Sequence, residues 1–207
     1  MSRIQYRFTD AITDPPGRSD ALHTEQLIRL PSGFLSFFPS TEAPDIKPLP
    51  YKINSFITFG SFNNLAKISP EVIAVWSRAM HAVPGSQILM KNSAFGDATT
   101  VQRFINMFND NCIEADRIKL VPSTVTHTEH LNVYNRVDIA LDSFPYNGTT
   151  TTCESLWMGV PVIVMAGKQH SGRVGMSILH RLSLEECIAN DEDEYVKKAT
   201  CAQQWKF

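Results

Sequence analysis

The chain has 207 residues, 43% of them hydrophobic and 19% charged, which is enough to bury the core of one main α/β domain. Its 19 basic and 21 acidic residues leave a net charge of −2, so the strongly basic face of a nucleic-acid-binding protein is excluded and any phosphate site must be local. The four cysteines form no Cys-x-x-Cys pair, no segment approaches the roughly 20 apolar residues of a membrane span, and a signal-peptide pattern is absent, so we expect a reduced, cytoplasmic chain without membrane contact.

Proline dominates the beginning of the chain. Seven of the 12 prolines fall within the first fifty residues, where they limit regular helices and strands. We therefore predict that residues 1–52 form a wrapping or linker segment with one short helix around Asp20–Arg29. Residues 53–207 are predicted to form the main domain.

From Phe56 onward, short apolar runs alternate with segments of helical periodicity, which is typical of β-α-β units. Ser69 and Pro70 begin a helix that ends at Pro84-Gly85. The predicted strands are Phe56–Gly60, Gln87–Lys91, Ile118–Val121, Asp138–Asp142 and Val160–Met165, and the further helices are Thr99–Asn109, Thr128–Val137, Thr150–Met158 and Arg173–Leu182. This order predicts a Rossmann-like, doubly wound parallel sheet that binds its ligand at the carboxyl ends of the strands.

The loop Phe144–Glu154 follows a predicted strand and runs through Gly148 and four threonines into a helix. A helix N-terminus offers unpaired N–H groups, Gly148 lets an anion approach the backbone, and the hydroxyls of Thr149, Thr150 and Thr151 add donors. The pattern favours a cradle for a diphosphate. The alternative is that Thr151 and Glu154 form a capping box without any ligand, and Glu154 could instead accept hydrogen bonds from the ribose of a nucleotide.

A second polar loop, Gly60–Lys67, also follows a strand and precedes a helix. Lys67 lies two residues before the predicted N-cap Ser69, so its ammonium can reach the same cleft and balance charge that grows on a departing diphosphate. The alternative is an ordinary solvated lysine.

Three histidines are further candidates. His127 and His130 lie one helical turn apart, but a zinc site would need more ligands than this pair, so His130 is better placed against a base or ribose and His127 could be a solvated helix start. His170 lies on a glycine-flanked loop that either lines the sugar-phosphate end of the site or is a surface loop.

The Asp-x-Asp pattern of Asp191 and Asp193 is interpreted as an acidic helix start, so no metal and no cofactor are expected.

The motifs Phe59–Pro70 and Leu141–Pro161 resemble the carboxyl-terminal catalytic lobe of the O-GlcNAc transferase family, glycosyltransferase family 41, above all its bacterial TPR-containing and SPINDLY-type members. The similarity extends to Tyr6–Asp10, Asp14–Pro16 and Glu25–Pro31, and downstream to Glu192–Val196, so it covers nearly the whole chain. It implies the carboxyl-terminal lobe of a GT-B fold: residues 53–207 would bind the nucleotide sugar and stop before its terminal helix, and residues 1–52 would come from the region between the lobes.

The resemblance further implies a protein O-glycosyltransferase that transfers GlcNAc from UDP-GlcNAc to Ser or Thr hydroxyls by a metal-independent inverting displacement. Six residues would take family roles: the phosphate-stabilising Lys67, Asn64 near it, His130 near the nucleotide, the phosphate-binding Thr150 and Thr151, and the ribose acid Glu154. A lysine and a helix terminus stabilise negative charge more as the bond breaks than before, which is what catalysis requires.

Two departures leave alternatives open. Animal O-GlcNAc transferases carry histidine where this chain has Thr149, whereas SPINDLY-like members, some of which use GDP-fucose, carry threonine, so protein O-fucosyl transfer is the rival within the enzyme class. The chain also lacks TPR repeats and the amino-terminal catalytic lobe, so we expect it to be inactive alone. A non-catalytic nucleotide-binding module is the rival from another class.

Overall fold

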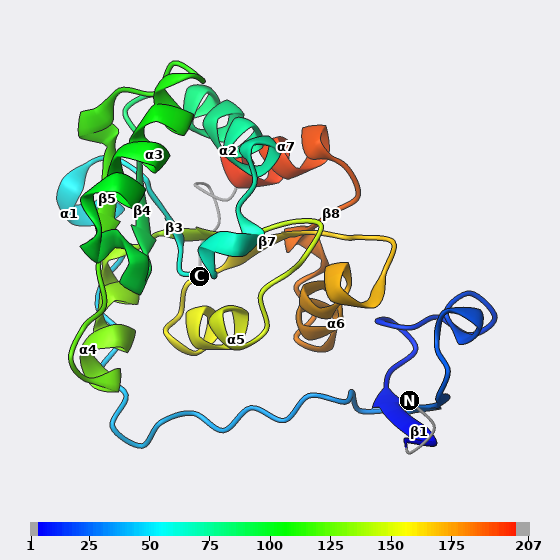
Figure 1. Ribbon diagram of the computed structural model, residues 1–207. Coiled ribbons are helices and arrows are strands. Elements are labelled where there is room, and N and C mark those ends of the chain that lie inside the picture. Colours follow the sequence, from blue (N-terminus) through cyan, green and yellow to red (C-terminus); the bar gives the residue numbers. More distant parts are fainter. Residues whose placement is uncertain (1–3, 202–207) are drawn as a thin grey trace.

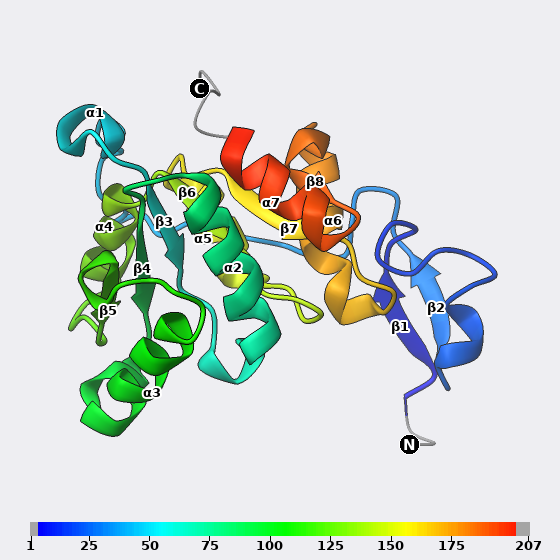
Figure 2. The ribbon, with the colours of Figure 1, turned by 90° about the horizontal axis from the view of Figure 1, so that it is seen from above.

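The computed structural model describes residues 4–201, and its centre is a six-stranded parallel sheet in the order β5-β4-β3-β6-β7-β8. Figures 1 and 2 show this sheet from two sides, with a second, smaller sheet of β1 and β2 at the far end of the molecule. The strands of the main sheet are β3 (Thr58–Ser61), β4 (Gln87–Lys91), β5 (Ile118–Val121), β6 (Ile139–Leu141), β7 (Val162–Met165) and β8 (Ile188–Ala189). The five predicted strands are confirmed. The sixth strand, β8, was not predicted, because two residues are too few to give a recognisable strand pattern.

Helices cover both faces of the sheet. In Figure 1, α2 (Pro70–Ala82) and α7 (Glu192–Cys201) lie above its β3–β7 part, and α5 (Thr150–Trp157) and α6 (Val174–Arg181) lie below it. The remaining helices are α1 (Tyr51–Asn54), α3 (Ala98–Asn109) and α4 (His127–Asn132). Within residues 4–201, none of the helices combines the length and the apolar character that crossing a bilayer requires.

Local capping signals set the helix starts. The Ser69 hydroxyl accepts a hydrogen bond from the Val72 amide at the start of α2, as the Ser-Pro pair predicted. Thr126 and Glu129 form a reciprocal capping box at the start of α4. The predicted helix Thr128–Val137 is only partly correct, because α4 ends at Asn132 and a 3-10 turn covers Val133–Arg136.

One part of the core lies between α2, α7 and the sheet. Trp76 and Tyr195 are fully buried, and the Trp76 indole N–H donates to the Tyr195 hydroxyl over 3.3 Å. That hydroxyl donates in turn to the carbonyl oxygen of Asp142 at the end of β6, over 2.9 Å. A polar thread therefore runs through the core and reaches the carboxyl edge of the sheet.

The predicted helix around Asp20–Arg29 is wrong. Only Asp20–Leu22 forms a 3-10 turn, and Gln26–Arg29 is the strand β2, which pairs in parallel with β1 (Tyr6–Thr9). As a strand, Gln26–Arg29 forms its backbone hydrogen bonds with β1, whereas a short helix would leave several of its own amides without partners. In addition, Pro31 disfavours a helical conformation at the residue before it. The Arg29 guanidinium completes the turn by donating to the Asp14 carbonyl oxygen and the Asp20 carboxylate.

Candidate active site

The strand order places two loops side by side at the carboxyl edge of the sheet. From β3 the chain moves outward to β4 and β5 and then returns to β6 on the other side of β3. In a doubly wound sheet, the point where the direction of winding reverses opens a crevice beyond the strand ends. The two loops singled out in the sequence leave β3 and β6, so the topology brings them to this crevice.

The turn at Gly148 is built around a buried carboxylate. The sequence predicted that an anion could approach the backbone at Gly148. The Gly148 amide instead donates to Asp142 Oδ1 over 2.7 Å, so this amide already has a partner. A Cβ at position 148 would lie 2.5 Å from the Thr151 hydroxyl and 2.9 Å from Asn63 Oδ1. These side chains lie so close to the backbone that only glycine fits at this position. Thr149 then forms the N-cap of α5 without a side-chain cap, and Thr150 is exposed.

The capping-box alternative for Thr151 and Glu154 is not what the structure shows. The Thr151 hydroxyl donates to Asn63 Oδ1 over 3.1 Å, and the Asn63 amide donates to Asp142 Oδ1 over 3.0 Å. A hydroxyl has one proton to give, so Thr151 presents acceptor lone pairs toward other groups while this bond lasts. The predicted extra donor at Thr151 therefore requires its hydroxyl to rotate.

Lys67 reaches from the loop Gly60–Lys67 to the loop Phe144–Glu154, which we call the threonine loop. Its ammonium donates to the Asn147 carbonyl oxygen over 2.9 Å and lies 4.0 Å from the centroid of the Tyr146 ring. Partial burial lowers the pKa of Lys67, and the charge of Asp142 acts in the opposite direction. An ammonium has three donors, so this lysine can bind the loop and an incoming anion together. The solvated-lysine alternative does not describe this side chain.

Asp142 is the electrostatic centre of the crevice. Burial raises the pKa of its carboxyl to about 6, against hydrogen bonds from Gly148, Asn63 and Ser143 and the charge of Lys67, which all favour the ionised form. Its Oδ2 atom is buried and has no hydrogen-bond partner among the described residues. The carboxylate thus holds the two loops together at a cost in desolvation.

Four residues form a second polar cluster at α5, which we call the histidine cluster: Lys91, His130, Tyr134 and Glu154. His130 Nε2 lies 3.0 Å from Glu154 Oε2, which also accepts from the Tyr134 hydroxyl over 3.3 Å. Lys91, at the end of β4, places its ammonium 2.8 Å from His130 Nδ1. Burial lowers the pKa of Lys91 and, with the Glu154 charge, raises the pKa of Tyr134 well above its ordinary value. The fold thus brings Glu154 and His130, two of the predicted site residues, into direct contact.

Two other candidates lie at the rim. His127 is exposed at the first position of α4, and its ring is stacked on that of His130 with centroids 5.7 Å apart. Asn64 is exposed and caps the following 3-10 turn by accepting from the Ala66 amide over 3.0 Å. The buried polar residue of this loop is its neighbour Asn63, which the sequence did not single out.

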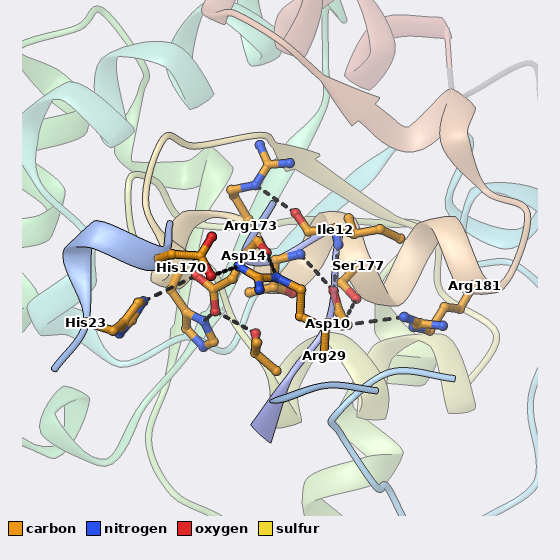
Figure 3. A network of polar contacts seen from close by, with 12 residues as sticks. Asp10, Ile12, Asp14, His23, Arg29, His170, Arg173, Ser177 and Arg181 are labelled. Carbon is orange, nitrogen blue, oxygen red and sulfur yellow. Dashed lines mark hydrogen bonds and ion pairs between the residues drawn. The ribbon is translucent and has the colours of Figure 1, made fainter. Parts of the chain in front are cut away.

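The side chain of His170 turns toward the N-terminal segment. Its Nδ1 lies 2.7 Å from a carboxylate oxygen of Asp14, within a network that also holds Asp10 and Ser177 (Figure 3). Asp10 also forms an ion pair with Arg181. Asp10 and Asp14 are 1% exposed, so these hydrogen bonds and ion pairs fasten residues 4–29 to the α6 region. The His170 loop does adjoin the threonine loop, because the Asn147 amide donates to the Ser171 carbonyl oxygen over 2.8 Å.

The acidic start of α7 serves the helix itself. Asp191 Oδ1 accepts from the Glu194 amide over 2.8 Å, and Asp193 forms an ion pair with Arg78 on α2. These contacts confirm the interpretation of this segment as a helix start. Across residues 4–201, no group of three or more His, Cys, Asp or Glu side chains is arranged to hold a metal ion.

Sequence reasoning missed Asn63, Lys91, Tyr134 and Asp142. Lys91 carried a usable signal, because a lysine that ends the apolar run Gln87–Lys91 must find a partner if it is buried. Asp142 carried one too, as a carboxylate directly after a buried strand. Their partners lie 39 and 79 residues away in the chain, and only the fold identifies them.

Comparisons with known proteins agree with this geometry. Residues 49–204 match the profile of Glycosyl transferase family 41. Over 199 residues the chain is 47% identical to a Petunia hybrida protein named probable UDP-N-acetylglucosamine–peptide N-acetylglucosaminyltransferase SPINDLY, covering 96% of this chain and 21% of that protein. Over 146 residues it is 30% identical to the Caenorhabditis elegans UDP-N-acetylglucosamine–peptide N-acetylglucosaminyltransferase, covering 69% of this chain and 12% of that one.

A solved structure gives the same answer. A mutant of Thermobaculum terrenum O-GlcNAc transferase superposes with a TM-score of 0.90 at 33% identity, over 96% of this chain and 37% of that one. The superposition and the six-stranded parallel sheet confirm the predicted Rossmann-like lobe of a GT-B glycosyltransferase. The chain spans about a fifth of the length of the SPINDLY relative. With the profile match over most of its residues, the chain belongs to glycosyltransferase family 41.

Proposed function

We propose that this chain is the donor-binding lobe of a protein O-glycosyltransferase that transfers GlcNAc from UDP-GlcNAc to Ser or Thr hydroxyls without a metal ion. The observation that carries the proposal is the bond from the Lys67 ammonium to the Asn147 carbonyl oxygen, 2.9 Å long, which sets a positive charge beside the N-terminus of α5. The family relatives named above act, by their names, with UDP-N-acetylglucosamine on peptides, and this supports the choice of donor.

The chemistry follows from where positive charge gathers. An acceptor hydroxyl oxygen attacks the anomeric carbon, the bond from that carbon to the phosphate oxygen breaks, and its electron pair leaves with the diphosphate. The ammonium of Lys67 and the backbone amides at the first turn of α5 would stabilise this growing charge. The acceptor proton would pass to a general base.

Glu154 and His130 would hold the nucleoside. The hydrogen bonds that Glu154 accepts within residues 4–201 fall on Oε2, which leaves Oε1 to accept from ribose hydroxyls. His127 and His130, with rings stacked at the rim, would offer a flat surface to the base. Thr149 and Thr150 would add hydroxyl donors to the phosphates.

Calorimetry tests the binding step. UDP is expected to bind more tightly than GDP, with the same affinity in the presence of EDTA. Lys67→Ala should weaken UDP by about tenfold or more, because a hydrogen bond to a charged group contributes about 1.5–3 kcal/mol. Lys197→Ala, which removes an exposed lysine from α7, is the matched control.

Turnover tests the transfer itself, in a longer chain that carries the amino-terminal lobe. Loss of one charge-stabilising donor typically reduces kcat by about 10²–10³-fold, which is the effect expected for Lys67→Ala in a peptide glycosylation assay. Unchanged turnover would remove Lys67 from the mechanism. Tighter binding of GDP than UDP would favour the fucosyl-transfer alternative, and nucleotide binding without turnover would favour the non-catalytic module.

A further inference from the structure

Lys91 has no role in the function described so far, although it is 7% exposed and lies in the histidine cluster. Its ammonium is 2.8 Å from His130 Nδ1. A buried lysine is costly unless its donors are satisfied, and an ammonium has donors only. The ring nitrogen that faces Lys91 must therefore accept, which makes Nδ1 the unprotonated nitrogen of His130.

The other ring nitrogen is determined by this first contact. If Nδ1 accepts from Lys91, a neutral His130 carries its proton on Nε2, and this N–H donates to Glu154 Oε2 over 3.0 Å. A second proton on Nδ1 would point an N–H at the Lys91 ammonium, with no acceptor between two positive groups. The remaining titratable neighbours, Tyr134 and His127, approach His130 by ring contacts, with centroids 5.8 Å and 5.7 Å away.

We propose that Lys91 is a positioning residue: it holds the His130 ring with Nδ1 as the acceptor and the proton on Nε2, and His130 in turn orients the Glu154 carboxylate toward the nucleoside. The three residues come from β4, α4 and α5, so the chain of contacts joins three elements around the site. Glu154 is 9% exposed and His130 is 23% exposed, so the carboxylate is held inside and the ring forms part of the wall. The step that involves the nucleoside rests on the proposed function.

Nitrogen NMR of the histidine rings tests the first step. The protein has six histidines, and the His130 signals can be assigned by their disappearance in His130→Asn. Wild-type His130 is expected to show a protonated Nε2 and an unprotonated Nδ1 that accepts a hydrogen bond. Lys91→Met should move the Nδ1 signal, because this nitrogen loses its donor, whereas Lys91→Arg keeps a donor at this place and should retain the wild-type pattern.

Binding of UDP tests the second step in the same variants. Lys91→Met is expected to weaken UDP by about tenfold, the equivalent of one hydrogen bond, and Lys91→Arg by much less. Lys119→Met is the matched control, because Lys119 lies on the neighbouring strand β5 and its exposed ammonium donates to the Asp116 carbonyl oxygen.

The outcomes separate this inference from the proposed function. A proton on Nδ1 in the wild type, or the same His130 shifts in Lys91→Met and wild type, would overturn the inference while UDP binding stands. Altered shifts in Lys91→Met with unchanged UDP affinity would overturn the orienting step. Failure of the wild type to bind UDP or GDP, with the expected His130 shifts, would overturn the proposed function and leave the role of Lys91 toward His130 supported.

Discussion

Replacing Asp142 by asparagine should change how the stability of the protein depends on pH. The pKa of this carboxyl is about 6 in the folded protein, compared with an ordinary value of 3.8 for an aspartate side chain. Because the folded value is the higher one, the folded state favours the protonated form. Its contribution to stability is complete below about pH 3.8 and is lost as the pH rises through about 6. At 1.36 kcal/mol for each pKa unit, the loss amounts to about 3 kcal/mol at pH 7.

Asparagine keeps the acceptor oxygen for Gly148, Asn63 and Ser143 but places an amide group where Oδ2 is buried without a partner. The unsatisfied amide costs about 1–3 kcal/mol at every pH, so the offset between the two proteins is not diagnostic. The slope is diagnostic. The free energy of unfolding of Asp142→Asn relative to wild type should rise by about 3 kcal/mol between pH 3.5 and pH 7.

Urea denaturation at a series of pH values measures this difference. Other carboxyl groups titrate in both proteins, so subtracting one curve from the other isolates Asp142. Asp116→Asn, which changes an exposed carboxyl on the surface, should give a flat difference curve. A flat curve for Asp142→Asn as well would mean that this carboxyl ionises normally, and the account of a costly buried carboxylate at the crevice would be refuted.

Three further predictions concern single contacts. Gly148→Ala should abolish UDP binding in calorimetry, because its Cβ would lie 2.5 Å from the Thr151 hydroxyl; retained affinity would contradict the close approach. Tyr195→Phe should lower the free energy of unfolding in urea by about 1–3 kcal/mol, because the hydroxyl bonds both Trp76 and the Asp142 carbonyl oxygen; no change would show that water replaces it. Asp14→Ala should make the segment after β2 susceptible to limited proteolysis, and in wild type the same susceptibility should appear on acidification. The reason is that burial raises the pKa of Asp14, but hydrogen bonds from Thr9 and His170 and the charges of His170 and His23 together bring it below its ordinary value. The stabilisation from Asp14 is therefore present above the ordinary pKa and is lost as the pH falls through the folded one.

The parts of the fold that sequence reasoning predicted are those with local signals. Ser69 and Pro70 begin α2, apolar runs mark the five longer strands, and the two loops after β3 and β6 stand out by their glycine, asparagine and threonine content. The order of alternating elements then implied a crevice where these loops meet. The sequence thus predicts Lys67 in that crevice, where its ammonium bonds the Asn147 carbonyl oxygen.

The parts that were missed depend on distant partners. Gln26–Arg29 was predicted as helix because its own residues carry no signal that β1 pairs with it. The Thr-x-x-Glu pattern occurs at Thr126–Glu129 and at Thr151–Glu154, and only the first is a capping box. The second is diverted because Asn63 and His130, both far away in the sequence, offer better partners to its side chains. Identical local patterns thus take different structures according to what the fold places beside them.

A buried carboxylate lies at each end of β6, Asp138 at the amino end and Asp142 at the carboxyl end, although burying a charge costs free energy. β6 has three residues, and only two register pairs join it to β3. At its amino end, Asp138 accepts from the amides of Tyr51 and Thr58 over 2.9 Å and 2.8 Å, and at its carboxyl end Asp142 accepts from Gly148. Burial raises the pKa of both carboxyls, so each opposes folding at neutral pH in proportion to its shift. The carboxylates supply the bonds to neighbouring segments that so short a strand cannot make with its own backbone.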